Sequence, residues 1–276
     1  MTPTRLLAGR TVATVGQGTW KMADRPASRA AEIAALQRGV ELGLTVIDTA
    51  EMYGEGASES LVGEALRGRR DAVTLVSKVY PHNADRRRLP QACAASLRRL
   101  GTDRLDLYLL HWRGSVPLAE TVEAFEHLRQ AGDIAAWGVS NFDVADLEEL
   151  WAAGGQNCAT NQILYNLVRR GPEHDLLPWM ARHAVPVMAY SPVEQGRLPA
   201  NPGLRRVAER HGVTPEAVAL AFAIRSGQVV AIPKASTLAH VDANAAAGAL
   251  VLDVDDLAAL DAAFAPPRTK QPLAML

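Results

Sequence analysis

Four side chains in the first half of the chain are suited to acid–base chemistry: Asp48, Tyr53, Lys78 and His111. A phenol has an unperturbed pKa of ~10, and a neighbouring ammonium group stabilises the phenolate, so we expect Lys78 to lower the pKa of Tyr53. The Asp48 carboxylate is suited to hold that ammonium group in place. His111 is suited to hydrogen-bond a carbonyl oxygen while Tyr53 donates the proton. The set predicts reduction of a carbonyl group, with the hydride supplied by a cofactor.

The elements that must position these side chains alternate regularly along the chain. Short runs rich in β-branched residues or leucine precede longer stretches rich in Ala, Leu, Glu and Arg, a pattern typical of parallel strands joined by helices. The predicted strands are Val12–Gly16, Thr45–Asp48, Val73–Lys78, Leu105–His111, Ala135–Ser140, Ala159–Gln162, Pro186–Tyr190 and Val229–Ile232. Eight such strands favour a closed barrel over an open sheet.

Helices are expected between and after these strands, and Ser58 is expected to cap the second of them. The predicted helices are Ser28–Leu42, Ser58–Arg67, Leu89–Leu100, Leu118–Ala131, Val144–Trp151, Leu238–Ala247 and Asp255–Phe264. We therefore expect an α/β protein, a (β/α)8 TIM barrel with a C-terminal helix and a short tail. No linker or repeat divides the chain, so residues 1–276 are expected to form a single domain.

Active sites of such barrels lie where the carboxyl ends of the strands meet. The predicted strands end in polar and aromatic residues, including all of the candidate acid–base groups. Singly, each has a structural explanation: Asp48 as a helix cap, Lys78 as a solvated strand end, His111 as a satisfied buried histidine. Together on one barrel face they favour a catalytic site.

Seven stretches distributed over the chain carry a family resemblance. They are VIDTAEMYG at 46–54, LVSKVY at 75–80, DLYLLHW at 106–112, WGVSNF at 137–142, ATNQILYN at 159–166, MAYSP at 188–192 and AIPKAS at 231–236. In this order and along almost the whole chain, they resemble the aldo-keto reductase superfamily. Within it, the chain looks like short-tailed bacterial members similar to methylglyoxal reductases.

The resemblance implies an NAD(P)H-dependent carbonyl reductase whose four catalytic positions match Asp48, Tyr53, Lys78 and His111. It also implies that the cofactor extends across the barrel mouth, with Tyr190 stacked on the nicotinamide. The carboxamide would be held by Ser140, Asn141 and Gln162. The pyrophosphate would be covered by Ser191 and Leu198, and the adenosine 2′-phosphate and adenine held by Lys234, Ser236, Thr237, His240 and Asn244. Further implied contacts are Gly18, Thr19, Trp20 and Ile232.

The phosphate segment departs from the family pattern. His240 stands where many members carry Arg, and Ala235 and Ala243 replace a common Ser and Glu. An imidazole is a weaker and pH-dependent partner for phosphate than a guanidinium group. Because Lys234 and two hydroxyl groups remain, NADPH is the expected cofactor, with a modest preference over NADH.

Aromatic residues near the strand ends are expected to line the substrate pocket: Trp20, Tyr80, Trp112 and Phe142. Trp137, Trp151 and Trp179 are instead assigned to packing. The loop after His111 and the tail beyond Phe264 are short. In the family these segments form much of the pocket wall, so a small aldehyde or ketone is the expected substrate.

Composition excludes several other classes of protein. With a formal charge of -1 and 21% charged residues, the chain lacks the basic field of a nucleic-acid-binding protein, and no apolar stretch is long enough to cross a membrane. The two cysteines, Cys93 and Cys158, are expected to be buried and free, and no cluster has the spacing of a metal site. The first residues lack the pattern of a secretory signal, so a cytoplasmic protein is expected. The family resemblance implies a monomer.

Two other functions remain open. Lys78 could form a Schiff base in an aldolase, which requires a lysine of depressed pKa. Alternatively, the chain could be a cofactor-binding regulatory subunit without significant turnover, as some relatives in the superfamily are.

Overall fold

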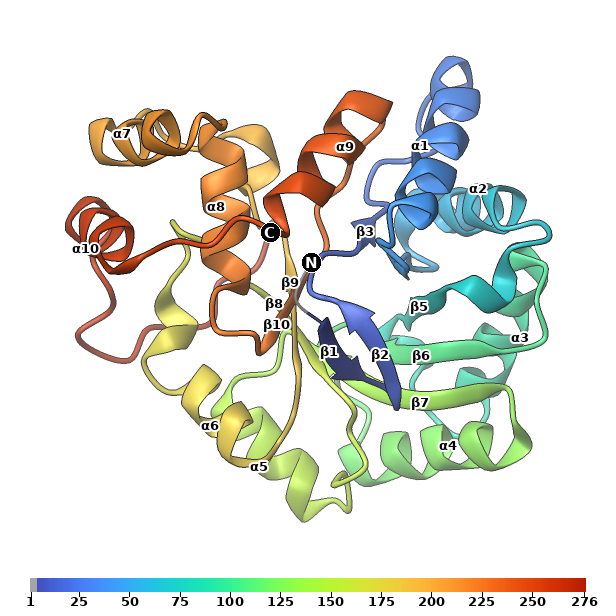
Figure 1. Ribbon diagram of the computed structural model, residues 1–276. Helices are drawn as coiled ribbons and strands as arrows, with labels where there is room; N and C mark the ends of the chain where they lie inside the picture. Colours follow the sequence, from blue (N-terminus) through green and yellow to red (C-terminus); the bar gives the residue numbers. More distant parts are fainter. Residues whose placement is uncertain (1–3) are drawn as a thin grey trace.

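The computed structural model describes residues 4–276, and its centre is a sheet of eight parallel strands (Figure 1). In spatial order, these are β3 (Gln17–Gly18), β4 (Val46–Asp48), β5 (Thr74–Val79), β6 (Leu105–Leu110), β7 (Ile134–Ser140), β8 (Asn161–Leu164), β9 (Val187–Tyr190) and β10 (Val229–Ala231). Parallel bridges from Val15 to Ala231 and from Gly18 to Lys234 join the first strand to the last. These bridges complete a (β/α)8 barrel, which confirms the predicted fold class.

Side chains alternate between the two faces of each strand and thereby form two hydrophobic cores, one inside the barrel and one between the strands and the helices. Val46, Val76 and Leu109 belong to the cluster inside the barrel, whereas Ile47 and Leu75 belong to the cluster between strands and helices. Because side chains on a strand alternate between its two faces, residues two positions beyond these inner ones also point inward. This parity decides which strand-end residues face the barrel mouth.

Helices surround the barrel and cover the outer faces of its strands (Figure 1). They are α1 (Arg29–Glu41), α2 (Ala57–Ala65), α3 (Arg88–Leu100), α4 (Leu118–Ala131), α5 (Val144–Ala152), α6 (Leu176–Arg182), α7 (Pro202–His211), α8 (Pro215–Ile224), α9 (Leu238–Ala247) and α10 (Val254–Ala263). Local chemistry defines several of their ends: Asp143 and Asp146 form a capping box on α5, and Gly101 and Gly132 end α3 and α4 with positive φ. The final helix and a short tail follow the last strand, as expected.

A two-stranded hairpin precedes the barrel. Its strands, β1 (Thr4–Leu7) and β2 (Arg10–Ala13), are antiparallel, and the turn residues Ala8 and Gly9 both have positive φ. The predicted first strand, Val12–Gly16, is therefore only partly right: Val12 and Ala13 belong to the hairpin, whereas Val15 and Gly16 already pair with Ala231 in the barrel, just before β3. Leu7 and Val12 of the hairpin pack into the inner cluster.

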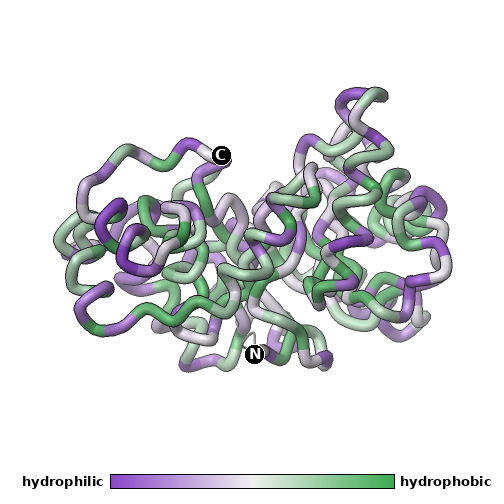
Figure 2. The backbone as a smooth tube through the Cα atoms, turned by 45° about the horizontal axis from the view of Figure 1, so that its top comes forward, coloured by the Kyte–Doolittle hydropathy of each residue, from purple (hydrophilic) through white to green (hydrophobic). Residues whose placement is uncertain are grey.

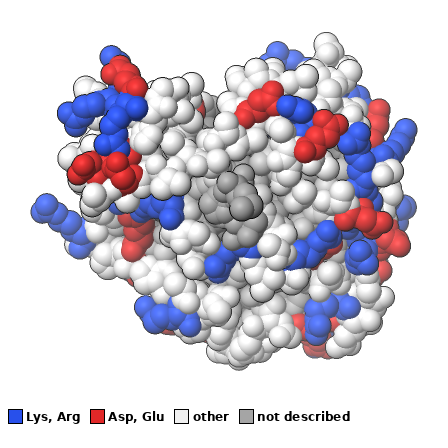
Figure 3. Space-filling view, in the orientation of Figure 1, with Lys and Arg blue, Asp and Glu red and all other residues white. Residues whose placement is uncertain are grey.

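Within residues 4–276, none of the helices combines the length and hydropathy that a bilayer crossing requires (Figure 2). On the face seen in Figure 3, the described Lys and Arg residues are interspersed with Asp and Glu around the rim, in keeping with the near-zero net charge. Cys93 and Cys158 are buried and free, as predicted.

Candidate active site

Three candidate residues end neighbouring strands and point into the barrel. Asp48 follows inner Val46 by two positions, Lys78 follows inner Val76, and His111 comes directly after β6, two positions beyond inner Leu109. Asp48 and Lys78 are 2% and 0% exposed. The carboxyl ends of adjacent parallel strands thus bring together groups that are 30 or more residues apart in sequence.

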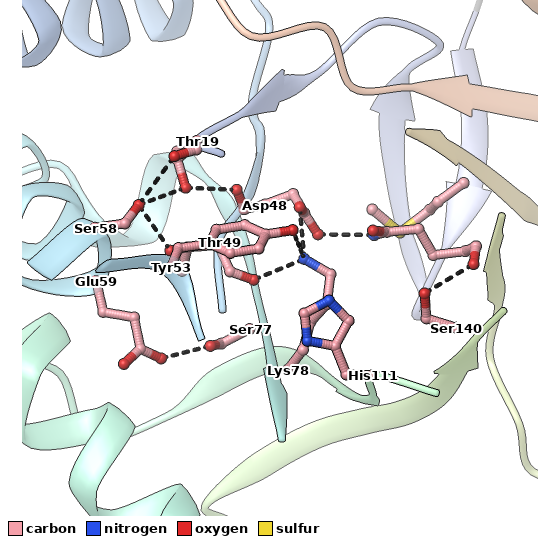
Figure 4. A network of polar contacts seen from close by, with 12 residues as sticks. Thr19, Asp48, Thr49, Tyr53, Ser58, Glu59, Ser77, Lys78, His111 and Ser140 are labelled. Atoms are coloured by element: carbon pink, nitrogen blue, oxygen red, sulfur yellow. Dashed lines mark hydrogen bonds and ion pairs between the residues drawn. The ribbon is translucent and has the colours of Figure 1, made fainter. Parts of the chain in front are cut away.

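The ammonium group of Lys78 is held by three acceptors (Figure 4). Nζ lies 2.7 Å from Asp48 Oδ2, 2.9 Å from the carbonyl oxygen of Thr49 and 3.0 Å from the phenolic oxygen of Tyr53. Because the ammonium group has three hydrogens, these contacts match its full donor capacity. The predicted contact of Asp48, Tyr53 and Lys78 is present.

Tyr53 reaches this position through a loop of unusual backbone geometry. Gly54, Glu55 and Gly56 directly after it have φ values of 58°, 53° and 89°, and α2 begins at Ala57. Left-handed conformations are accessible to glycine but costly for glutamate. The loop therefore directs the phenol inward while the chain turns outward into α2. The helix begins after Gly56, and Ser58 lies within its first turn, so the expectation that Ser58 caps it is wrong.

Burial determines the protonation of these groups. It raises the pKa of Tyr53, because the phenolate is poorly solvated there, and the Lys78 ammonium only partly opposes that shift. Lys78 thus acts on the pKa of Tyr53 in the predicted direction, but nothing in the sequence indicated that burial would outweigh it and leave that pKa raised. Burial alone would lower the pKa of Lys78, but the charge of Asp48 and the hydrogen bonds to Asp48 and Tyr53 outweigh it and raise that pKa. At neutral pH the site holds a protonated phenol beside an ammonium group.

His111 faces the same spot. Its ring centroid lies 5.9 Å from that of Tyr53, and its Nδ1 is buried without a hydrogen-bond partner among residues 4–276. Burial and the nearby Lys78 ammonium lower the pKa of His111 to about 2. The imidazole is consequently neutral at pH 7 and has one N–H available to donate to a carbonyl oxygen.

The residues predicted to hold a nicotinamide lie on the next three strands: Ser140 ends β7 and Asn141 follows it, Gln162 lies within β8, and Tyr190 ends β9. Gln162 is buried, and its amide donates to Asp48 Oδ1 at 2.7 Å. The Tyr190 hydroxyl donates to Asn141 Oδ1 at 2.9 Å, and the Asn141 amide donates to Ser140 Oγ at 3.2 Å. Asn141 has a φ of 61°, a strained conformation for a residue other than glycine that is concentrated at functional sites.

Beyond Tyr190 the candidate phosphate-binding residues lie on two loops and one helix. Ser191 and Leu198 are partly buried in the loop after β9, while Lys234, which follows β10, is exposed. Thr237 caps α9 by accepting from the backbone N–H of His240 at 3.3 Å. The other expected residues of this segment, Ser236 and Asn244, are partly exposed, and His240 is exposed.

Three expected cofactor residues are buried: Gly18, Thr19 and Ile232. The Thr19 hydroxyl donates to the carbonyl oxygen of Asp48 at 2.9 Å and accepts from Ser58 at 2.8 Å. The Thr19 hydroxyl is therefore occupied by contacts with Asp48 and with Ser58 of α2, and the role of Thr19 in cofactor binding stays a prediction. Ile232 packs in the inner cluster.

Three aromatic residues surround the acid–base groups. Trp20 contacts the Tyr53 ring edge-to-face at 4.9 Å between centroids, and Trp112 contacts His111 at 4.9 Å and Tyr80 at 5.8 Å. Trp20 is 38% exposed. These contacts place Trp20, Tyr80 and Trp112 where the sequence predicted a pocket wall.

Phe142 does not belong to that wall. It is 0% exposed and packs in the outer cluster with residues of the helical layer, so its assignment to the substrate pocket is wrong. Strand parity counted from Ser140 would point Phe142 inward, but β7 ends at Ser140 and Asn141 has a positive φ, so the chain turns outward before Phe142. Trp137 and Trp179 are buried in the same outer cluster and Trp151 packs against it, which confirms their assignment to packing.

Sequence reasoning missed several residues that complete the site. Thr49 supplies a backbone carbonyl to Lys78, and Ser58 and Glu59 of α2 lie fully buried just behind it. The available signal was their place in the stretch from Asp48 to Glu59, which has polar residues between apolar ones. No group of three or more His, Cys, Asp or Glu residues able to hold a metal ion occurs in the described part of the chain.

Comparison with known proteins agrees with this geometry. The Aldo/keto reductase family matches residues 14–265. Methylglyoxal reductase YeaE of Escherichia coli strain K12 is 53% identical over 268 residues, which cover 95% of this chain and 94% of that protein. Methylglyoxal reductase DkgB of Escherichia coli O157:H7 is 30% identical over 253 residues, covering 89% and 92%.

Solved structures agree as well. A crystal structure of an aldo/keto reductase from Klebsiella pneumoniae, in complex with NADP and acetate, is 49% identical and superposes with a TM-score of 0.98 over 100% of both chains. The barrel and its strand-end site define an oxidoreductase of the (β/α)8 class. The chain belongs to the aldo/keto reductase family, which confirms the resemblance seen in its motifs.

Proposed function

We propose that the protein reduces small aldehydes or ketones to alcohols with NADPH, and that Tyr53 donates the proton. The observation that carries this proposal is the contact of the Tyr53 phenol with the Lys78 ammonium at 3.0 Å, beside a neutral His111. The curated relatives named as methylglyoxal reductases and the NADP complex of the Klebsiella protein support the substrate class and the cofactor.

The residues around the mouth fit a dinucleotide. Polar side chains lie at the end of β7 and within β8, the Tyr190 ring at the end of β9 is partly exposed, and exposed Lys234 follows β10. When bound, a reduced nicotinamide supplies the hydride that side chains cannot furnish. Ser140, Asn141 and Gln162 would hold its carboxamide, and Lys234 would face the 2′-phosphate. Tyr190 would pack its aromatic face against the nicotinamide ring.

The protein's own groups then act on the carbonyl oxygen. The neutral His111 imidazole donates a hydrogen bond to that oxygen and orients the carbonyl carbon for hydride transfer. As the carbon gains hydride, the oxygen takes the proton of the Tyr53 hydroxyl, and the resulting phenolate is stabilised by Lys78. The phenolate regains a proton from solvent, which completes the balance of one hydride and one proton per alcohol formed.

Trp20, Tyr80 and Trp112 give this site an apolar rim. Aromatic walls exclude water from a small carbonyl compound and leave few polar groups with which to bind a sugar-sized one. Small dicarbonyl compounds such as methylglyoxal and aromatic aldehydes are therefore the proposed substrates. The expectation of a cytoplasmic monomer remains a prediction.

The aldolase alternative is disfavoured by the charge on the lysine. A Schiff base needs an uncharged amine, whereas the charge of Asp48 and the hydrogen bonds to Asp48 and Tyr53 raise the pKa of Lys78. A regulatory subunit without turnover would bind NADPH and leave it unoxidised in the presence of carbonyl compounds.

The test is oxidation of NADPH, followed by absorbance, with methylglyoxal and nitrobenzaldehyde as substrates. Tyr53→Phe should lower kcat by about 100-fold or more, because it removes the proton donor and keeps the ring. The Kd of NADPH from fluorescence quenching should change little. A near-normal kcat for Tyr53→Phe would refute the assignment, and tight NADPH binding without wild-type turnover would favour the regulatory subunit.

A further inference from the structure

A chain of three buried hydroxyl groups lies behind the acid–base site (Figure 4). Thr49 Oγ1 donates to Ser58 Oγ at 3.2 Å, Ser58 Oγ donates to Thr19 Oγ1 at 2.8 Å, and Thr19 Oγ1 donates to the carbonyl oxygen of Asp48 at 2.9 Å. All three hydroxyl residues are 0% exposed. Because each hydroxyl has one hydrogen to donate, the chain runs in one direction only.

The two ends of this chain are the residues that hold the lysine. Thr49 accepts from Lys78 Nζ through its backbone carbonyl, and Asp48 accepts from the same atom through its carboxylate. The hydroxyl groups therefore close a ring of contacts around residues 48 and 49. Replacing Ser58, at the middle of the hydroxyl chain, would break the hydrogen bonds that connect the Thr49 side chain to the Asp48 carbonyl, without removing any contact of the ammonium group.

The first turn of α2 also contacts β5, the strand that carries Lys78. Ser77, which directly precedes Lys78, donates to Glu59 Oε1 at 2.5 Å. The other oxygen of Glu59 pairs with Arg99 of α3 at 2.5 Å, and Glu59 is 0% exposed. Buried charge-assisted contacts of this kind hold their partners in one geometry.

We propose that the first turn of α2, through Ser58 and Glu59, is a positioning element for the Lys78 ammonium group, acting from outside the barrel. The left-handed turn at 54–56 joins this helical turn directly to Tyr53, so one short segment carries the phenol and the groups that orient its neighbour. Ser58 and Glu59 are 0% exposed and lie outside the barrel, away from the groups proposed to act on the substrate. Their expected effect is on turnover and not on binding, because displacement of a catalytic group by a fraction of an ångström slows chemistry.

The inference rests on the proposed carbonyl reduction, and the wild-type enzyme is therefore assayed first. Ser58→Ala should lower kcat with methylglyoxal by about tenfold, the rate equivalent of one lost hydrogen bond. KM for methylglyoxal and the Kd of NADPH should stay within about twofold of wild type, because the change removes no group that binds the substrate or the cofactor. Ser60→Ala is the matched control, because among residues 4–276 the Ser60 hydroxyl bonds only the carbonyl oxygen of Gly56, the N-cap of the same helix.

Thr49→Val supplies an independent second variant. It keeps the side-chain shape and removes the hydroxyl that donates to Ser58, so it should lower kcat similarly even if Ser58→Ala folds poorly. The double variant should lose no more than the larger single loss, because both changes break the same chain.

If the wild-type enzyme turns over and kcat is unchanged in both Ser58→Ala and Thr49→Val, the positioning role is overturned and the proposed function remains intact. A fall in kcat accompanied by an equal rise in the Kd of NADPH also overturns it, since that pattern indicates general loosening. Absence of turnover in the wild type overturns both proposals.

Discussion

The buried pair of Asp48 and Lys78 allows a quantitative prediction about stability. Lys78→Met keeps the bulk of the side chain but removes the charge 2.7 Å from Asp48 Oδ2. The carboxylate, 2% exposed, then retains the Gln162 amide as its side-chain hydrogen-bond donor. Removing one member of a buried ion pair costs about 3–5 kcal/mol, because the other charge is left uncompensated. We expect the free energy of unfolding at pH 7 to fall by that amount.

Replacing both charges should recover most of the loss. In Asp48→Asn/Lys78→Met, the site holds two neutral groups of nearly the original shape, and the Asn oxygen can still accept from Gln162. The free energy of unfolding should return to within about 1.5 kcal/mol of wild type, since a neutral pair avoids the desolvation of two ions. Activity should remain lost in both variants, which separates stability from chemistry.

The pH dependence gives the same prediction a second check. Without Lys78, burial raises the pKa of Asp48 unopposed by the ammonium group. The folded protein then binds more protons at Asp48 than the unfolded chain does, so stability relative to wild type falls as the pH rises. The deficit of Lys78→Met should therefore be smaller at pH 5.5 than at pH 7.

The assay is urea denaturation followed by circular dichroism. The variants are compared only if their m-values, the slopes of the unfolding free energy against urea concentration, agree. Arg86→Met serves as the control, because its partner Glu123 lies 2.5 Å away but both side chains are about 60% exposed. That change should cost less than about 1 kcal/mol. Equal losses in the single and double variants, or a Lys78→Met loss as small as that of the control, would refute the buried-pair reasoning.

Three further predictions follow from individual residues. The pKa of His111 is about 2 in the folded protein, so its contribution to stability is complete above the unfolded value of ~6.5 and is lost at about 1.4 kcal/mol per pH unit as the pH falls below it. His111→Gln should therefore flatten the dependence of the urea midpoint on pH between pH 6 and 4.5. An unchanged dependence would contradict a neutral buried imidazole. Lys234→Met should weaken NADPH about tenfold and NADH hardly at all in fluorescence titrations, and equal losses would place the 2′-phosphate elsewhere. Phe142→Ala should cost about 3–5 kcal/mol of stability with KM little changed, whereas Trp112→Ala should raise KM with little loss of stability; the opposite pattern would restore Phe142 to the pocket.

Much of the chemistry was readable in the chain alone. Asp48, Lys78 and His111 each close a run with strand character, and parallel strands deliver their carboxyl ends to one face of a barrel. The alternation of strands and helices therefore specified both the fold class and the face on which these groups meet. Local patterns were sufficient because strand direction and side-chain chemistry are properties of short segments.

Other features depended on contacts between distant segments. The run from Val12 to Gly16 divides between a hairpin and the barrel, because residues 14–18 pair with 231–234 at the far end of the sequence. Phe142 and Trp112 both follow strand ends, yet one packs under the helices and the other lines the mouth. Only the paths of the loops after β6 and β7 decided between them.

The direction in which the pKa of Tyr53 shifts also depended on the tertiary structure. The sequence placed a cation beside the phenol, but the pKa depends on the balance between that cation and the loss of water from the whole surrounding site. Likewise, Ser58 was expected to cap α2, and its role in the hydroxyl chain became visible only when Thr19 and Thr49 were brought against it. A side chain's chemistry belongs to its residue type, whereas its solvation and its partners are set by every segment that folds around it.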